Sequence, residues 1–135
     1  MVGIELDQDA IAVNLENRSL ADFEDCQWDI INGDVLQMSN MFRADVVITN
    51  PPFGTKNNSG IDFQFLKIAQ TLAKEAIYSL HKTSCREGLE RKTKKIGLEG
   101  EVVAEMSFDL PKTYRFQKSA SKNIKVDLWR FDAST

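Results

Sequence analysis

The sequence predicts an α/β fold with a mostly parallel sheet that ends in an antiparallel pair of strands. Short apolar runs alternate with segments whose apolar residues recur at helical spacing, which is the pattern of βαβ units. Residues 44–49 (ADVVIT) contain a continuous β-branched run, as expected for a strand that is buried on both faces. The length of 135 residues is typical of one domain, so residues 1–135 are expected to form a single domain.

The elements can be assigned in order along the chain from apolar spacing and from turn residues. The expected strands are residues 1–6, 27–32, 44–49, 76–80, 102–109 and 124–131, the last two being antiparallel. The expected helices are residues 9–20, 63–73 and 86–96, with a short helix or turn over 35–42. Asp7 or Asp9 can cap the first helix, because an aspartate before the first apolar residue accepts bonds from free amides.

Composition excludes several classes of protein. The chain contains two cysteines, Cys26 and Cys85, in no CxxC pair, and one histidine, His81, so we expect reduced thiols and no metal site. No apolar run approaches the roughly 18 residues that a membrane span needs, and the N-terminus does not resemble a secretory signal. An intracellular protein that does not cross a membrane is therefore expected.

The charge is distributed unevenly along the chain. Residues 1–50 contain ten acidic and two basic side chains, a net charge of −8, whereas residues 51–135 contain ten acidic and fifteen basic ones, a net charge of +5. A basic second half favours a polyanion such as RNA, although any single lysine is equally typical of a solvated helix. The candidate RNA-binding residues are Lys56, Lys82, Arg86, Arg91, Lys92, Lys94, Lys95, Lys112, Arg115 and Lys118.

The motif Asn50-Pro51-Pro52-Phe53 directly follows the strand over residues 44–49, at the edge of the sheet where α/β proteins bind ligands. The Asn50 side chain and the Pro51 carbonyl can each accept a hydrogen bond, and the prolines make this backbone stiff. Two such acceptors can hold both hydrogens of a planar –NH₂ group, while Phe53 offers a face for stacking. The motif therefore indicates methylation of a planar nitrogen; a rigid turn is the structural alternative.

Two acidic residues at strand ends fit a nucleoside cofactor. Glu5 ends the first expected strand and can accept both hydroxyls of a ribose, as strand-end acids do in dinucleotide-binding folds. Asp34 follows the second strand and can accept a hydrogen bond from an adenine amine. Each carboxylate is equally typical of a helix cap or turn.

Four stretches resemble the methyltransferase-like 5 family, namely NPPFGTKNNSGIDFQFLKIA, YSLHKTS, DLPKTYRFQKS and VDLWRF. Members of this family use S-adenosylmethionine to methylate adenine N6 in small-subunit ribosomal RNA. The resemblance implies a Rossmann-like class I methyltransferase sheet, with Asn50, Pro51, Pro52 and Phe53 as the catalytic tetrad. It also implies a small zinc-binding activator, the tRNA methyltransferase 112 homologue, as partner in a heterodimer, and a location in the nucleus and cytoplasm.

The same resemblance assigns cofactor contacts. It implies Glu5 at the ribose of S-adenosylmethionine and Asp34-Val35 at its adenine, with Asn50 also at the cofactor. The family has a glycine-rich DLGCGxG segment on its first strand, and nothing in this sequence corresponds to it. We therefore expect a partial methyltransferase domain that begins at the second strand and lacks the first.

In the strand order 3-2-1-4-5-7-6 that the resemblance implies, the first strand lies at the centre of the sheet. Its absence is expected to leave residues 1–6 and 44–49 with unpaired edges, at about 1–3 kcal/mol for each unpaired buried group. Weak cofactor binding and low stability of the isolated chain are expected from this loss.

Two other functions fit the same residues. The tetrad also suits DNA adenine or the side-chain amide of glutamine, and the basic second half favours nucleic acid. A different class is a truncated, inactive chain that binds the activator protein or RNA.

Overall fold

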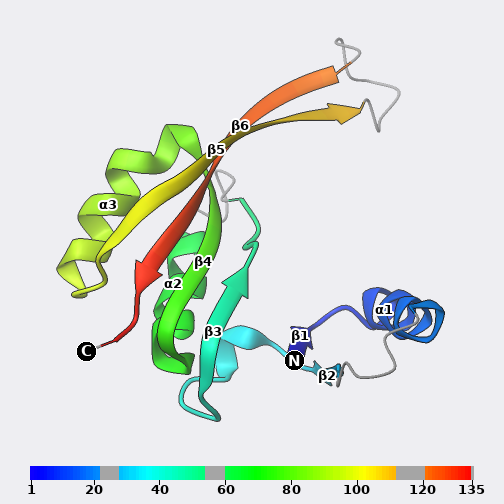
Figure 1. Cartoon of the computed structure of the whole chain (residues 1–135). Coiled ribbons are helices and arrows are strands. Elements are labelled where there is room, and N and C mark those ends of the chain that lie inside the picture. Colours follow the sequence, from blue (N-terminus) through cyan, green and yellow to red (C-terminus); the bar gives the residue numbers. More distant parts are fainter. Residues whose placement is uncertain (22–27, 54–59, 112–120, 135) are drawn as a thin grey trace. The chain divides into compact units, whose positions relative to one another are not determined.

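A computed structural model describes residues 1–21, 28–53, 60–111 and 121–134 of the chain (Figure 1). These residues belong to two compact units, Met1–Ser39 and Asn40–Thr135, each with its own sheet. No helix among the described residues is both long enough and apolar enough to span a membrane.

The first unit is a βαβ unit with a two-stranded sheet. Its elements are β1 (Val2–Glu5), α1 (Gln8–Leu20), β2 (Asp29–Asn32) and the 3₁₀ turn η1 (Val35–Gln37). The two strands are parallel, with Glu5 opposite Asn32 at their carboxyl ends. The Asp7 carboxylate accepts from the amide of Asp9 at 2.9 Å, so Asp7 is the helix cap of the two predicted candidates, Asp7 and Asp9.

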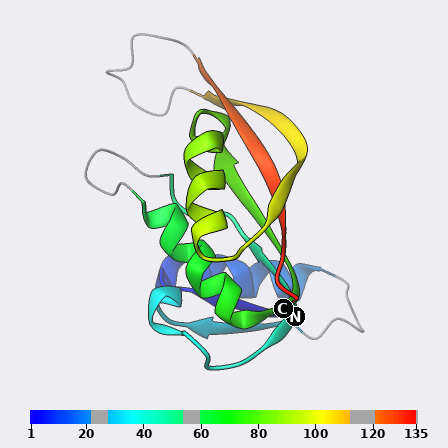
Figure 2. The same cartoon turned by 90° about the vertical axis from the view of Figure 1, so that its left-hand side faces the viewer.

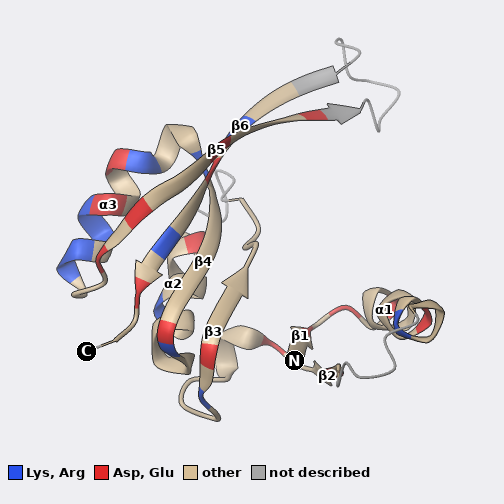
Figure 3. Cartoon of the chain, viewed as in Figure 1, with Lys and Arg blue, Asp and Glu red and all other residues tan. Residues whose placement is uncertain are grey.

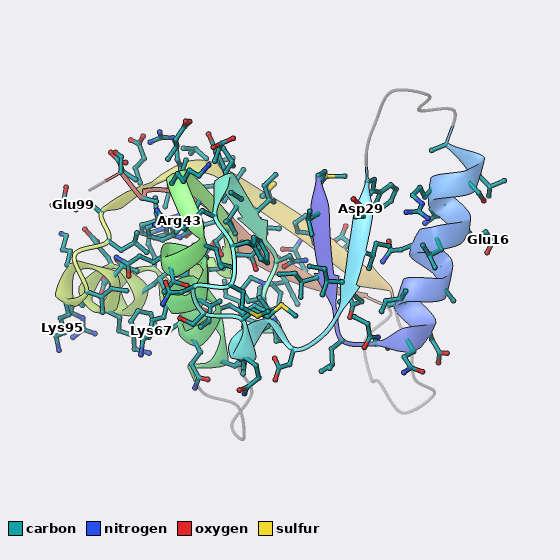
Figure 4. The ribbon with its side chains drawn as sticks, turned by 90° about the horizontal axis from the view of Figure 1, so that it is seen from below. Glu16, Asp29, Arg43, Lys67, Lys95 and Glu99 are labelled. Atoms are coloured by element: carbon teal, nitrogen blue, oxygen red, sulfur yellow. The ribbon has the colours of Figure 1, made fainter. Side chains whose placement is uncertain are left out.

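The second unit contains a four-stranded sheet with the order β3-β4-β6-β5 (Figure 1). Its elements are β3 (Ala44–Thr49), α2 (Ile61–Leu72), β4 (Ala73–Lys82), η2 (Thr83–Cys85), α3 (Arg86–Lys95), β5 (Gly100–Pro111) and β6 (Ser121–Asp132). β3 and β4 are parallel, whereas β6 is antiparallel to both β4 and β5. Arg43, labelled in Figure 4, donates from Nη2 to the Ala73 carbonyl at 3.0 Å and so joins the starts of β3 and β4.

The core of the second unit lies between the sheet and its two helices, which Figure 2 shows in front of the strands. Leu66 and Ala69 of α2 and Leu89 of α3 pack against Ile77 of β4 and against β6. On β6, Trp129 and Phe131 point to the same face and stack with ring centroids 5.4 Å apart. A Cβ at Gly100 would overlap the Phe131 ring, so a glycine begins β5 where it crosses that ring.

The predicted fold class is confirmed, because parallel pairs precede a terminal antiparallel pair. The pairing of β1 with β2 and the order β3-β4-β6-β5 are those that the methyltransferase resemblance implied. The expected elements are present, and β4 extends further in both directions than residues 76–80.

The expectation that residues 44–49 are buried on both faces is wrong. Val47 packs against the core beneath α2, but Val46 and Ile48, on the other face, are 44% and 82% exposed. Both helices of this unit lie on one face of its sheet, so no described element of the unit covers the second face. The β-branched run reflects the preference of these residues for extended backbone rather than burial on both sides.

Candidate functional site

Asn50-Pro51-Pro52-Phe53 begins at the carboxyl end of β3, as predicted. Thr49 lies opposite Ser79, and because β3 and β4 are parallel, Asn50 emerges at the same edge as the end of β4. Pro51 is buried and Phe53 is half-buried, whereas Asn50 and Pro52 are exposed. A buried proline anchors the motif, and the Asn50 amide is left open to a ligand.

A small apolar cavity of about 160 Å³ lies beside the motif. Asn50 supplies the polar part of its lining, and the other walls come from β4, β5, β6 and the motif itself. These walls are Phe53, Leu80, Phe108, Ile124 and Val126. Apolar walls with one orienting amide are suited to a flat, uncharged ring that carries a hydrogen-bonding edge.

Phe53 also lines a larger cavity of about 400 Å³, which lies between the N-terminal part of α2 and α3. Phe53 lines both cavities, and the Lys82 ammonium lies 5.3 Å from the centroid of its ring. Such a distance gives an attractive cation–π contact. The end of β4 therefore places a positive charge directly beside the motif.

A buried hydrogen-bonded chain lies under this edge of the sheet. His81 is 1% exposed; its Nε2 is 2.7 Å from Ser79 Oγ and its Nδ1 is 3.3 Å from Asp62 Oδ2. Because an ionised Asp62 only accepts, Nδ1 donates the hydrogen of the bond to the Asp62 carboxylate. The hydrogen bond from His81 lowers the pKa of Asp62 below its ordinary value.

The order Ser79, His81, Asp62 is also that of a nucleophilic triad, but the geometry does not support this role. Ser79 is 0% exposed, so its hydroxyl does not reach a substrate. The hydrogen bonds between these three side chains instead connect β4 to the first turn of α2, close to the motif.

Arg86 was a predicted RNA ligand, and its guanidinium is already engaged. It donates from Nε and Nη2 to Asp127, each at 2.7 Å, and Nη2 also pairs with Glu105 at 2.9 Å. Thr83 donates to the same Asp127 carboxylate, which is 0% exposed, and the Arg86 bonds lower the pKa of that carboxyl. Arg86 therefore fixes α3 to the hairpin of β5 and β6.

Of the predicted cofactor residues, Glu5, Asp34 and Val35 belong to the first unit and Asn50 belongs to the second. Glu5 ends β1 and Asp34 follows the neighbouring parallel strand β2, and the Gly33 amide donates to the Glu5 carbonyl at 2.9 Å. Glu5 Oε1 accepts from the Asp7 amide and Asp34 Oδ1 accepts from the Leu36 amide, both at 2.9 Å. Both acids thus shape turns, and among the described residues no bond involves their second carboxylate oxygens. Val35 is half-buried in the η1 turn that Asp34 caps.

The other predicted RNA ligands separate into three groups. Lys56, Lys112, Arg115 and Lys118 lie outside the described residues. Lys82, Arg91 and Lys92 line the larger cavity, whereas Lys94 pairs with Glu90 at 2.8 Å. Figure 4 shows Lys95 projecting outward from α3, and Figure 3 shows that basic residues recur along that helix.

Sequence reasoning missed the hairpin residues of the small cavity, Phe108, Ile124 and Val126. Alternation in residues 124–131 indicates which side chains share a face, but the face that meets Asn50 depends on strand order. The described residues contain no group of three His, Cys, Asp or Glu side chains placed to hold a metal ion.

Comparison with known proteins adds a family. The family model described as N-6 DNA methylase matches residues 1–87. The Drosophila melanogaster protein named rRNA N(6)-adenosine-methyltransferase Mettl5 is 44% identical over 99% of this chain, and a Danio rerio protein of the same description, METTL5, is 42% identical over 96%. The chain spans 63% of the length of each of these relatives. The similarity to methyltransferase-like 5 proteins that the motifs indicated is thereby confirmed.

A solved structure supports the same fold. The crystal structure of a putative RNA methyltransferase, PH1948, from Pyrococcus horikoshii matches with a TM-score of 0.75 and 28% identity. The match covers 99% of this chain and 63% of that one. The Rossmann-like methyltransferase fold class expected from the sequence is therefore confirmed, with the strands of the described residues divided between two sheets.

Proposed function

The chain belongs to the N-6 DNA methylase family, and we propose that it methylates N6 of adenine in small-subunit ribosomal RNA with S-adenosylmethionine as methyl donor. One observation carries this proposal: Asn50 lies at the edge of an apolar cavity whose walls include Phe53 and Phe108. The cavity offers stacking surfaces for a base, and the amide can orient its amine.

The proposed chemistry depends on positioning. The lone pair of the adenine amine is delocalised into the ring, so the amine is a poor nucleophile. Hydrogen bonds from its two hydrogens to the Asn50 side chain and the Pro51 carbonyl favour a tetrahedral nitrogen with an available lone pair. The buried Pro51 keeps both acceptors in place. The methylated nitrogen is acidic and loses its proton without a strong base.

Two carboxylates of the first unit suit the proposed donor. Glu5 and Asp34 each retain one oxygen that accepts no bond among the described residues, which fits ribose hydroxyls and an adenine amine. When bound, S-adenosylmethionine supplies an electrophilic methyl group. Glu5, Asp34 and Val35 would hold its nucleoside part.

The choice of RNA as substrate is supported by two observations. Relatives that are 44% and 42% identical to this chain are named rRNA N(6)-adenosine-methyltransferases, although the family model is described by DNA. Lys82, Arg91 and Lys92 line the larger cavity beside Phe53, and such cations suit a polyanion. A heterodimer with the zinc-binding activator remains part of the proposal, and so does a location in the nucleus and cytoplasm.

Replacement of Asn50 tests the mechanism. Asn50→Ala removes one of the two acceptors that align the amine, and we expect methyl transfer to fall by roughly 100-fold or more. The measurement is N6-methyladenosine formed in ribosomal RNA by the 135-residue chain, with and without the activator, by mass spectrometry. Asn17→Ala, at an exposed position of α1, is the matched control. Equal rates for the two variants, or no product from the unaltered chain, would contradict the proposal.

A further inference from the structure

The proposed function places the target base in the small cavity and assigns no role to the larger cavity beside Phe53. We propose that it binds the nucleotide next to the target adenine in single-stranded RNA, with its phosphate held by Lys82, Arg91 and Lys92. This inference rests on the proposed function, because it takes the target base to lie against Asn50. The lining of this flanking-nucleotide pocket includes Phe53, Asp62, Phe63, Lys82, Arg91 and Lys92.

The two cavities are neighbours, because Phe53 lines both of them. Its ring lines the small cavity together with Asn50, and it also lines the flanking-nucleotide pocket. The small cavity, about 160 Å³, has room for little more than one base, so the attached strand has to continue beyond Phe53. The pocket on that path measures about 400 Å³.

The charges of the pocket suit a phosphodiester. Among the described residues, none of Lys82, Arg91 and Lys92 takes part in an ion pair, and Arg91 makes a long contact of 3.4 Å from Nε to the Glu87 carbonyl. Two carboxylates, Asp62 and Glu87, also line the pocket, and the Asp62 carboxylate bonds to His81. Three cations against two anions leave a positive balance, and the cations are free to donate to a phosphate.

Aromatic rings lie directly under two of these cations. Lys82 Nζ is 5.3 Å from the Phe53 centroid, and Lys92 Nζ is 5.7 Å from the Phe63 centroid. A base can stack on such a ring while the displaced ammonium binds the adjoining phosphate, which is how single-stranded nucleic acids are held. A recess of this kind receives an unpaired strand more readily than a duplex.

Charge removal in the pocket provides the first test. Binding of a short fluorescent oligoribonucleotide with one adenine to the 135-residue chain is followed by anisotropy over a range of salt concentrations, without methyl donor. Lys82→Gln, Arg91→Gln and Lys92→Gln are each expected to weaken binding about three- to tenfold and to lower the salt slope by about one. Lys67→Gln, on an exposed part of α2 outside the pocket (Figure 4), is expected to change the affinity and the salt slope only slightly.

A neutral phosphate provides the second test. Oligoribonucleotides are compared in which an uncharged methylphosphonate replaces the phosphate on one side of the adenine, on the other side, or at a distant position. Replacement of the phosphate on one of the two sides of the adenine should weaken binding to the unaltered chain. The same replacement should have little effect on binding to a Lys82→Gln/Lys92→Gln variant. Lys82→Arg, which retains the charge, should preserve the sensitivity of the unaltered chain.

Three results would overturn the proposal: no binding by the unaltered chain, indifference to both adjacent replacements, or pocket variants that bind as Lys67→Gln does. Circular dichroism of each variant establishes that its fold is intact. Because binding is measured without methyl donor, these results do not depend on the methylation assay with Asn50→Ala. Methylation that depends on Asn50 but RNA binding that is insensitive to the pocket would refute this inference and leave the proposed function standing.

Discussion

At the scale of single residues, His81 has a function that its position in the sequence does not disclose. Its ring is buried and bonds to Ser79 on one side and to Asp62 on the other. Because a buried polar group is costly without partners, the ring requires both neighbours to stay in place. His81 therefore holds the first turn of α2 against β4, close to the flanking-nucleotide pocket.

The contribution of Asp62 to stability is expected to depend on pH. Its pKa is lowered in the folded chain from 3.8 by the hydrogen bond from His81. A carboxyl whose folded pKa is depressed stabilises the fold above its unfolded pKa, and this stability is lost as pH falls through the folded pKa. Asp62→Asn should therefore lower the free energy of unfolding by about 1–2 kcal/mol at neutral pH and by much less in acid. Urea denaturation at neutral and acid pH measures the free energy of unfolding. An equal loss of this free energy at both pH values would contradict the stabilising role of the ionised Asp62.

At the scale of elements, one buried carboxylate connects three parts of the second unit. Asp127 of β6 accepts from Thr83 of η2 and from Arg86 of α3, and Arg86 also reaches Glu105 on β5. The two carboxylates differ in environment: the Asp127 side chain is 0% exposed and the Glu105 side chain 68% exposed. The buried bond is therefore the one that fixes α3 to the sheet.

This difference predicts unequal effects of two substitutions. Asp127→Ala removes the acceptor of three hydrogen bonds and is expected to destabilise the fold by about 2–4 kcal/mol. Glu105→Gln alters an ion pair exposed to solvent and is expected to cost less than about 1 kcal/mol. Chemical denaturation of both variants gives the comparison. Similar losses would show that the exposed pair matters as much as the buried one.

At the scale of the whole molecule, the two units are built very differently. In its described residues, the second has four strands and a continuous core around Leu66, Ile77 and Phe131. The described part of the first has two strands, and its helix α1 has no buried residue. A two-stranded sheet is marginally stable in water, whereas a sheet of four strands under two helices retains its hydrogen bonds.

Hydrogen exchange should report this contrast. Amides of β4, which pairs with strands on both sides, are expected to exchange slowest, and those of β1, α1 and β2 fastest. Exchange of the 135-residue chain followed by mass spectrometry on peptides resolves the two groups. Comparable protection of β1 and β4 would contradict the expectation, because it would require stabilising contacts that the first unit does not have by itself.

Much of the fold follows from local patterns. Helical spacing located α1, α2 and α3, and Asp7, one of the two aspartates predicted as possible caps, caps α1. The β-branched run over residues 44–49 coincides with β3. The number of covered faces could not be predicted, because Val46 and Val47 are chemically identical and only the placement of the helices decides which of them is buried.

The sequence by itself determined that the motif Asn50-Pro51-Pro52-Phe53 directly follows a strand. Because prolines cannot donate the backbone hydrogen bonds of a sheet, the strand has to end there, and this also determined the edge of the sheet at which the motif lies. Tertiary structure alone decided what surrounds it. Phe108 and Ile124 lie beside Asn50 because β6 pairs with β4. Asp62, in the first turn of α2, bonds to His81 of β4. Such contacts join residues far apart in the chain, and their partners depend on long-range packing that no local pattern encodes.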